Sequence, residues 1–422
     1  MKTKTILSVL SLALAGGAFT LPSALAGGLE LYEIATPDVG LASAGYAACA
    51  QDAATVFKNP AGMSLLPGTQ IEFGAQLTYG DVKFSASPST SPLLGNNNGG
   101  NAIGALPGAS LFITHQFSDR FAVGFGTFSY FGLAENFGDN WIGRYYLEKG
   151  AMLGVSLMPA ASFKVTDWLS IGAGLNAMYG YMSGDVAVRT GALGDGQMSL
   201  NDSTWGFGGN AGLLIQPCDG TRIGITYLSP VKLGFKATPS FSNLGPLGGL
   251  SIFTSPPQLN LGMTVPQSVM LSGYHELNAK WALMADVGWQ NWSQYGKVDV
   301  GVDSAAPITL TKNLNYQDTW HGAIGARYQA SDTLQFTGGF AYDSSAVSDA
   351  NRTLSAPMGQ AYRIGLGAQY QISPKVALNA AYEFLWAGDM PVTQDSAYRG
   401  NVSGSFNDSW FSFFTLGLNW RF

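Results

Sequence analysis

Apolar and polar residues alternate along much of the chain, which is the pattern of β-strands that separate two different environments. In the run 281–290, one face carries Trp281, Leu283, Ala285, Val287 and Trp289, and the other carries Ala282, Met284, Asp286, Gly288 and Gln290. The first face suits lipid and the second a lumen, because a Lys or Arg facing mid-bilayer costs roughly 2–4 kcal/mol. We therefore expect Asp286 to point inward, and Trp281, Trp289 and Trp292 to lie in aromatic girdles at the membrane interfaces.

The last strand has the same two faces. Its outward set is Trp410, Phe414, Leu416, Leu418, Trp420 and the C-terminal Phe422. Inward positions of this and other strands carry Phe411, Phe413, Met178, Phe128 and Tyr130. A porin for hydrophilic solutes has a polar interior, so part of this lumen is predicted to be apolar. The alternative is that these side chains pack against a plug.

Short turns and longer loops separate the strands. Six turns lie at Ser118-Asp119, Thr166-Asp167, Asp219-Gly220, Asn278-Ala279, Ser331-Asp332 and Ser373-Pro374; seven loops cover roughly residues 86–107, 135–149, 190–203, 237–257, 299–313, 344–359 and 388–408. Outer-membrane barrels alternate short periplasmic turns with long external loops. These connections predict an all-β fold, a fourteen-stranded antiparallel transmembrane β-barrel over residues 69–422, with both barrel ends on the periplasmic side.

Residues 27–68 lack this alternation. The segment is rich in Ala and Gly and contains Asn59-Pro60-Ala61, and a proline cannot sit inside a regular ladder. We interpret residues 27–68 as an N-terminal plug, or hatch, inside the barrel. Ahead of it, residues 1–26 have a basic start, a short apolar run and Ala24-Leu25-Ala26, the order of a secretory signal peptide. A membrane anchor is the alternative, but the run is short for a spanning helix.

The composition favours an exported barrel. Only 11% of residues are charged, whereas soluble domains have about 25%, and the chain has 12% aromatic residues and 55 Gly. No long apolar helix is visible after the signal, which argues against a multi-span helical protein. A secreted β-solenoid is the competing class, although no fixed-period repeat supports it. The formal net charge of −6 argues against a nucleic-acid partner.

Residues with catalytic or metal-binding chemistry are few. His115, His275 and His321 lack metal-ligand spacing, and no nucleophile elbow or P-loop is visible. A Ser-His barrel lipase stays open as an alternative, because its triad need not be local in sequence. Cys49 and Cys218 allow one disulfide, but two unpaired thiols are the favoured interpretation. We expect no enzymatic activity, no metal and no cofactor.

Several motifs resemble the FadL family (OMPP1/FadL/TodX) of outer-membrane transporters of long-chain fatty acids and hydrophobic compounds. They are Gly45…Asp52-Ala53-Ala54…Asn59-Pro60-Ala61, Trp205-Gly206-Phe207-Gly208…Asn210-Ala211-Gly212, Tyr227-Leu228-Ser229-Pro230-Val231-Lys232, Trp292-Ser293-Gln294-Tyr295 and Asn351-Arg352. They span nearly the whole mature chain in the family's order. The resemblance implies a fourteen-stranded barrel with an N-terminal hatch, in agreement with the strand count.

The resemblance also implies a path for the ligand. Ligand enters through the external loops, binds above the hatch and leaves sideways at a kink in the third strand, expected here at residues 121–133. The gate that it implies comprises Asn59, Pro60 and Ala61 of the hatch and Phe131 and Gly132 of the strand. Gly132 is the residue able to take unusual backbone angles there.

Ligand-binding residues are implied by position in the loops. Lys312 matches a basic residue that binds the ligand carboxylate in the family, and Arg189 is a looser match; a solvated loop charge is the alternative for both. Residues 190–203 are shorter than the family's loop after the fifth strand, so the first binding groove is expected to be reduced. Apolar residues in the loop 237–257, including Phe241 and Phe253, form a candidate capture surface.

These observations predict passive uptake of long-chain fatty acids or similar hydrophobic molecules, with a lateral exit. The alternatives are a transporter of aromatic or aliphatic hydrocarbons with the same fold, and a structural or adhesive surface barrel. The expected partners are the hydrophobic ligand, outer-membrane lipids and, through Phe422, the outer-membrane assembly machinery. We expect a monomer.

Overall fold

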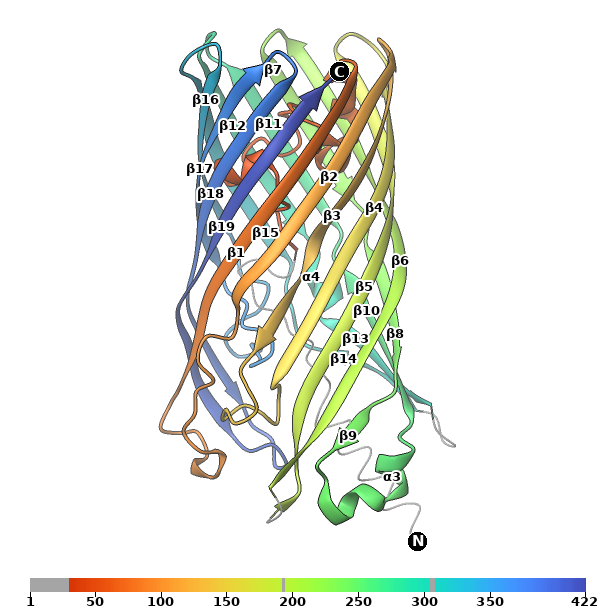
Figure 1. Ribbon diagram of the computed structural model, residues 1–422, viewed down its shortest axis with the longest axis vertical. Coiled ribbons are helices and arrows are strands. Elements are labelled where there is room, and N and C mark those ends of the chain that lie inside the picture. The colour runs from red at the N-terminus through yellow and green to blue at the C-terminus, as the bar shows by residue number, and fades with distance from the viewer. Residues whose placement is uncertain (1–29, 192–193, 304–307) are drawn as a thin grey trace.

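The computed structural model describes residues 30–191, 194–303 and 308–422, so the predicted signal peptide lies outside the described residues. The chain forms a closed antiparallel β-barrel (Figure 1). Its strands are β1 (Thr69–Ala86), β2 (Gly104–Ser118), β3 (Phe121–Asn136), β4 (Lys149–Lys164), β5 (Leu169–Arg189), β6 (Asp195–Cys218), β7 (Thr221–Leu228), β8 (Val231–Ala237), β10 (Gln258–Val265), β11 (Ser268–Glu276), β12 (Trp281–Gln290), β13 (Lys297–Asp303), β14 (Ile308–Asn313), β15 (Thr319–Gln329), β16 (Leu334–Asp343), β17 (Ala361–Ser373), β18 (Val376–Gln394) and β19 (Val402–Arg421).

Successive strands pair with one another, and β1 also pairs with β19, with Gln70 opposite Arg421, which closes the barrel. Four spans each consist of two strands separated by a short break, namely β7 with β8, β10 with β11, β12 with β13, and β14 with β15. Counted this way, the described strands make fourteen spans, and the predicted fold class is confirmed. The short strand β9 (Ser240–Ser242) belongs to a loop and pairs with β6.

The helices are short. The N-terminal segment contains η1 (Pro37–Leu41), α2 (Thr55–Lys58) and η2 (Pro60–Leu65), and the connections contain η3 (Pro92–Leu94), η5 (Gly245–Gly249), α3 (Ser251–Thr254) and α4 (Trp292–Tyr295). Within the described ranges, none of these helices has the length and hydropathy needed to cross a membrane.

The burial of alternate residues follows the predicted faces. On β12, Leu283 and Val287 are exposed on the outside, while Met284 and Asp286 are buried on the inside. The last strand behaves in the same way, since Phe411 and Phe413 are fully buried. The prediction for Trp292 is wrong. Its ring is buried in α4 and donates a hydrogen bond to Gln290 Oε1 at 2.9 Å, because the chain turns inward after β12.

Four strand segments, β8, β10, β13 and β14, form a separate sheet on the side of the barrel away from the C-terminus (Figure 1). On this sheet the outward positions are polar, as at Lys232, Lys236 and Asp299, and the inward positions carry Leu233 and Phe235. A charged outer face does not suit hydrocarbon. This sheet therefore extends the wall beyond the membrane.

Three loops were predicted too long, because the strands that flank them extend further than expected. The chain between β5 and β6 occupies only residues 190–194, that between β18 and β19 residues 395–401, and that between β13 and β14 residues 304–307. Polar residues in these stretches continue the ladders outside the membrane. Polarity therefore does not mark the end of a strand there.

Candidate functional site: the hatch, the lumen and the wall of β3

Residues 30–68, which we call the hatch, lie inside the barrel towards the end that holds the C-terminus (Figure 1). The turn η1 packs against β16, β17 and β18, and η2 packs against β4, β5 and β6. The end with short turns faces the periplasm in outer-membrane barrels. The hatch therefore lies at the periplasmic end of the lumen.

Asn59 ties the hatch to the wall. Its Oδ1 accepts from the Ala61 amide at 3.1 Å, and its Nδ2 donates to the carbonyl oxygens of Ala47 (2.7 Å) and of Leu213 on β6 (2.9 Å). The wall makes room for this side chain at Gly212, where an added Cβ would overlap Asn59 Oδ1. Pro60 follows at the first position of η2, where its missing N–H leaves no bond unmade.

A buried group of charges holds the start of the hatch. Arg363 on β17 pairs with Glu33 of the hatch and, at 2.8 Å, with Asp343 on β16. Asp343 also contacts His321 Nδ1 at 2.8 Å, and the ring of His321 lies 4.4 Å from that of Tyr32. Removing one partner of a buried ion pair costs roughly 3–5 kcal/mol. This cluster therefore fixes the first residues of the hatch to the wall.

The lumen on the extracellular side of the hatch is apolar. The ring of Phe57 in the hatch lies 4.4 Å from that of Phe128 and 5.0 Å from that of Tyr130 on β3. The same buried cluster continues through Met178 and the inner face of the four-stranded sheet, including Leu233, Phe235, Leu259, Leu261, Met263, Val298, Val300 and Val302. The predicted apolar lumen is confirmed, and Phe128 and Tyr130 also pack against the hatch as the alternative proposed.

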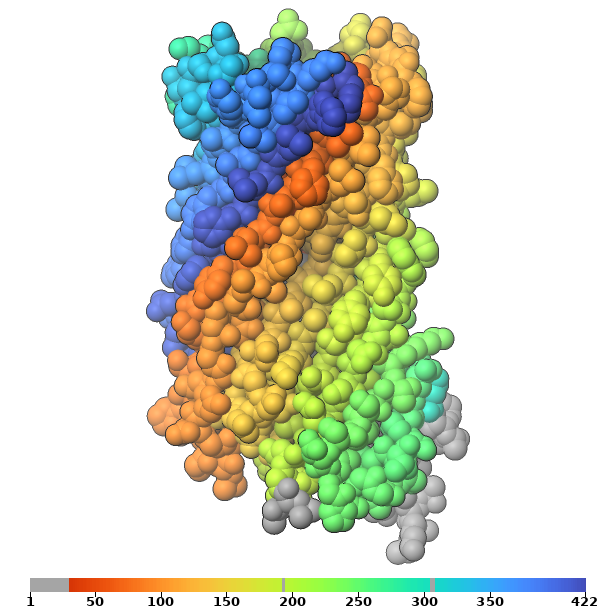
Figure 2. Space-filling view, in the orientation of Figure 1, coloured from red at the N-terminus to blue at the C-terminus, as the bar shows by residue number. Residues whose placement is uncertain are grey.

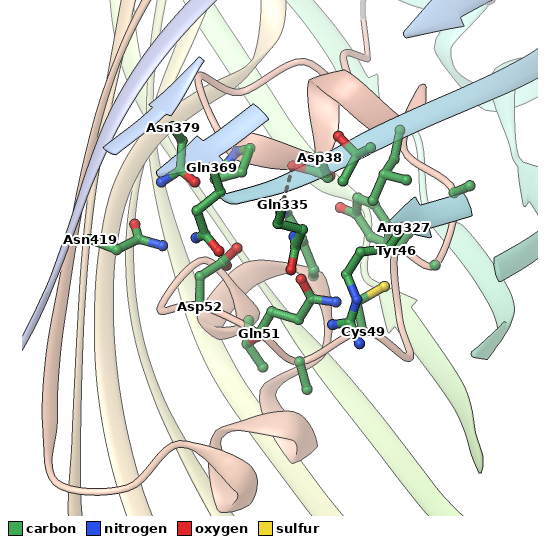
Figure 3. Close-up of a pocket in the computed structure, with 18 of the residues that line it drawn as sticks. Asp38, Tyr46, Cys49, Gln51, Asp52, Arg327, Gln335, Gln369, Asn379 and Asn419 are labelled. Atoms are coloured by element: carbon green, nitrogen blue, oxygen red, sulfur yellow. Dashed lines mark hydrogen bonds and ion pairs between the residues drawn. The ribbon is translucent and has the colours of Figure 1, made fainter. Parts of the chain in front are cut away.

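The opposite side of the hatch is polar. A cavity of about 270 Å³ lies between the hatch and β15–β19 (Figure 3). Its polar lining residues include Asp38, Gln51 and Asp52 of the hatch and Arg327, Gln335, Gln369, Asn379, Asn419 and Arg421 of the wall. Apolar cargo that reaches the hatch from outside therefore meets carboxamides and charges on the far side.

The wall is interrupted at β3. The β2–β3 ladder runs from Ser118 opposite Phe121 to Leu111 opposite Thr127 and then stops, although β2 continues to Gly104 along β1. In the β3–β4 ladder, two residues of β3 between Phe128 and Phe131 oppose one residue of β4, which is a β-bulge. In Figure 1, β3 diverges from β2 beyond this point. Figure 2 shows the same face with side chains.

Gly132 follows the bulge and has φ +139°, a conformation that residues with a Cβ rarely adopt. A Cβ there would also lie 2.8 Å from Leu153 Cα of β4. Phe131 is fully buried at the bulge. Of the predicted gate, Phe131 and Gly132 thus lie at the interruption, whereas Asn59, Pro60 and Ala61 lie against β5 and β6. The gating role of all five residues stays a prediction.

The interruption, which we call the window, has defined ends. Leu111 opposite Thr127 closes one end, and the Asn136 amide closes the other by donating to Ala102 O at 2.7 Å. Within it, the free edge of β3 pairs with the hatch, because Leu31 N donates to Tyr130 O at 2.7 Å. Residues Thr127–Asn136 of β3 therefore lack a hydrogen-bond ladder with β2. The first residues of the hatch pair with this free edge instead.

Lys312 lies on β14 opposite Val298, on the inner face of the four-stranded sheet. It is half-buried, close enough to Arg399 for the two positive charges to repel each other, and no carboxylate acts on either. Arg399 lies 5.4 Å from the ring of Tyr146, and burial lowers its pKa. Two cations facing an apolar lumen are suited to an anionic head group.

The family model described as outer membrane protein transport protein (OMPP1/FadL/TodX) matches residues 17–422. The chain belongs to this family. The 47 kDa outer membrane protein of Pasteurella multocida is 30% identical, with 86% of this chain and 88% of the relative covered. The long-chain fatty acid transport protein of Escherichia coli strain K12 is 24% identical, with 93% and 95% covered.

Solved structures show the same fold. A FadL homologue of Pseudomonas aeruginosa has a TM-score of 0.82 at 22% identity, with 93% of this chain and 99% of that chain covered. The toluene transporter TbuX of Ralstonia pickettii has a TM-score of 0.65 at 20% identity, with 93% and 99% covered. Membership of the FadL family makes the protein an outer-membrane β-barrel transporter of hydrophobic compounds, and a channel rather than an enzyme.

The other residues predicted to bind ligand lie nearer the outer rim of this FadL-family barrel. Arg189 is exposed at the end of β5 and lies 4.7 Å from the ring of Tyr145. Arg189 and Arg399 therefore stack on different rings, those of Tyr145 and Tyr146. In the loop 237–257, Phe241 and Phe253 pack edge to face with their ring centroids 5.0 Å apart. Leu250 beside them is exposed, which keeps an apolar surface at the rim.

Two features of the site escaped the sequence analysis. Arg399 lies in a loop without a motif, and nothing local signals that it approaches Lys312. Arg363 had a readable signal, because it is a charge at an inward position between the lipid-facing Tyr362 and Ile364.

The three histidines all have partners: Thr69 for His115, Thr221 for His275 and Asp343 for His321, each at 2.8 Å.

The structure shows Cys49 and Cys218 as free thiols. Among the residues that it describes, no group of His, Cys, Asp or Glu side chains is arranged to hold a metal ion.

Proposed function

We propose that this protein takes up long-chain fatty acids and similar hydrophobic molecules, and that the cargo leaves through the window into the outer membrane. The observation that carries this proposal is the missing β2–β3 ladder beside an apolar lumen. The names of relatives support the class of cargo, since several are called long-chain fatty acid transport proteins.

The path begins at the external loops. Exposed Leu247 and Leu250 offer an apolar capture surface. The carboxylate of the cargo then meets Lys312 and Arg399, and a hydrogen bond to a charged group contributes roughly 1.5–3 kcal/mol. The hydrocarbon chain occupies the apolar lumen above Phe57. The polar cavity beyond the hatch disfavours passage straight through, which leaves the window.

The test is to straighten β3. Deleting Ser129 removes the extra residue of the bulge, so that Phe128 and Tyr130 continue the ladder with β4. We expect uptake of labelled oleate by cells that lack their own FadL-family transporter to fall to background, while the purified variant still binds oleate. Deleting Ile372, which lies at the β17 irregularity next to a periplasmic turn, is the matched control and should leave uptake unchanged.

Three results would contradict parts of this proposal. Normal oleate uptake by the Ser129 deletion would remove the lateral exit. Equal affinity of the protein for an alkane and for its carboxylic acid would favour a hydrocarbon as cargo. Failure of the wild-type protein to increase the uptake of any hydrophobic compound would favour a surface structural barrel.

A further inference from the structure

Glu135 differs from the other buried carboxylates that the structure describes. It lies on β3, is only 3% exposed, and neither carboxylate oxygen has a hydrogen-bond partner. Glu33 pairs with Arg363, and Glu383, whose oxygens also lack a hydrogen bond, forms an ion pair with the same Arg363 at 3.8 Å. Asp286 accepts from the Tyr46 amide at 3.1 Å. Glu72 accepts from the Ala54 amide at 3.1 Å. Glu135 has no comparable partner, since it has neither an ion pair nor a hydrogen bond among the described residues.

The β3–β4 register shows where this side chain points. Gly132 is opposite Leu153, which is exposed on the outside, and Leu133 is opposite the fully buried Met152. Because strand residues alternate between faces, Glu135, two positions after Leu133, also points into the lumen. Its ladder partner is Gly150, which has no side chain to cover it.

Glu135 also lies beside the window. The next residue, Asn136, makes the hydrogen bond to Ala102 that closes the extracellular end of the window. Glu135 therefore faces the lumen at the extracellular end of the window. Leaving a buried polar group unsatisfied costs about 1–3 kcal/mol, so an unpartnered carboxyl group at this place needs an explanation.

We propose that Glu135 is a specificity-determining residue that hydrogen-bonds the hydroxyl-bearing head group of long-chain cargo at the window. The inference rests on the proposed function. A carboxyl group can both donate and accept when protonated, so it matches the hydroxyl of a long-chain alcohol or of an undissociated fatty acid. An alkane has no group that can form a hydrogen bond with this carboxyl group. Glu135 thus selects cargo with a polar end, after Lys312 and Arg399 have bound the head group outside.

The experiment compares two labelled cargoes of equal length, hexadecanol and hexadecane. Their initial uptake rates are measured in cells that lack their own FadL-family transporter and produce the full-length protein. The variants are Glu135→Leu, which removes the hydrogen-bonding atoms, and Glu135→Gln, which keeps them. Glu148→Leu, a buried carboxylate in the adjacent loop that already has Gln197 as partner at 3.1 Å, is the matched control. Heat-modifiable migration on gels checks that each barrel is folded.

We expect Glu135→Leu to lower the hexadecanol-to-hexadecane uptake ratio about tenfold, as expected for one lost hydrogen bond. Glu135→Gln and Glu148→Leu should stay within about twofold of the wild-type ratio. An unchanged ratio in Glu135→Leu, or an equal loss of both cargoes, overturns the inference. If the wild-type protein imports labelled oleate but not hexadecanol, the inference is overturned while the proposed function stands. If it imports neither oleate nor these two cargoes, the proposed function itself has failed. If Glu135→Leu does not fold, a wild-type ratio in Glu135→Ala overturns the inference just as clearly.

Discussion

Removing the Asn59 side chain should loosen the hatch without unfolding the barrel. The substitution Asn59→Ala deletes three hydrogen bonds, to Ala61, Ala47 and Leu213, at a side chain that is 2% exposed. At about 1 kcal/mol for each bond, the free energy of opening this part of the hatch falls by roughly 3 kcal/mol. That corresponds to roughly 150-fold faster amide exchange, since each 1.4 kcal/mol is a factor of ten.

Hydrogen–deuterium exchange followed by mass spectrometry measures this faster amide exchange of the hatch directly, in peptides that cover residues 47–66. Gly212→Ala should act on the same contact from the wall, because its methyl group displaces Asn59. In the Asn59→Ala background that methyl group meets an alanine, so the second substitution should add little. Asn379→Ala is the control, because the amide group of Asn379 has no hydrogen-bond partner among the described residues.

The reasoning is refuted if exchange in residues 47–66 of Asn59→Ala stays within about threefold of wild type. It is equally refuted if the effects of Asn59→Ala and Gly212→Ala simply add. Strand peptides from β12 and β19 should exchange as in wild type throughout, and faster exchange there would mean that the barrel had loosened instead.

Three further outcomes are expected. Lys312→Met and Arg399→Met should each weaken oleate binding about tenfold in equilibrium binding assays, while an alkane should bind them as it binds wild type; equal losses would contradict the head-group site. Burial raises the pKa of Glu148 to about 7, so the folded loop prefers the protonated acid and should lose stability as the pH rises from about 4.5 to about 7. Amide exchange in residues 137–148 should show this loss of stability, and Glu148→Gln should abolish the pH dependence. Maleimide should label the exposed Cys218 rapidly and Cys49 slowly, since burial raises the pKa of Cys49 to about 12; equal rates, or a disulfide, would contradict the structure.

The barrel was predictable because the bilayer imposes its own constraint on every strand. Alternation places Leu283 outside and Asp286 inside, and the burial of both side chains agrees. The constraint ends at the membrane surface. On the four-stranded sheet the outer face is charged and the inner face is apolar, so the membrane rule of apolar outside and polar inside does not apply to β8 and β13.

The candidate site was less predictable, because it depends on contacts between distant segments. The approach of Arg399 to Lys312 brings a loop residue to strand β14, and no local pattern connects the two segments. The pairing of Leu31 with Tyr130 joins the hatch to β3. Trp292 was misplaced for a similar reason, since a tryptophan at the end of an alternating run has the composition of a girdle residue. Only the inward turn of α4 shows that it is part of the interior.

The two sides of the hatch set the direction of the proposed path. Moving a buried methylene group into water costs about 0.8 kcal/mol, so a sixteen-carbon chain that entered the polar cavity beyond the hatch would lose on the order of 12 kcal/mol. Lateral movement through the window exchanges apolar protein for apolar lipid and avoids that loss. The hatch therefore need not leave the barrel for cargo to pass. In the proposed path it needs only to release the edge of β3 that pairs with Leu31, while the Arg363–Glu33 ion pair and the Asn59 hydrogen bond to β6 stay in place.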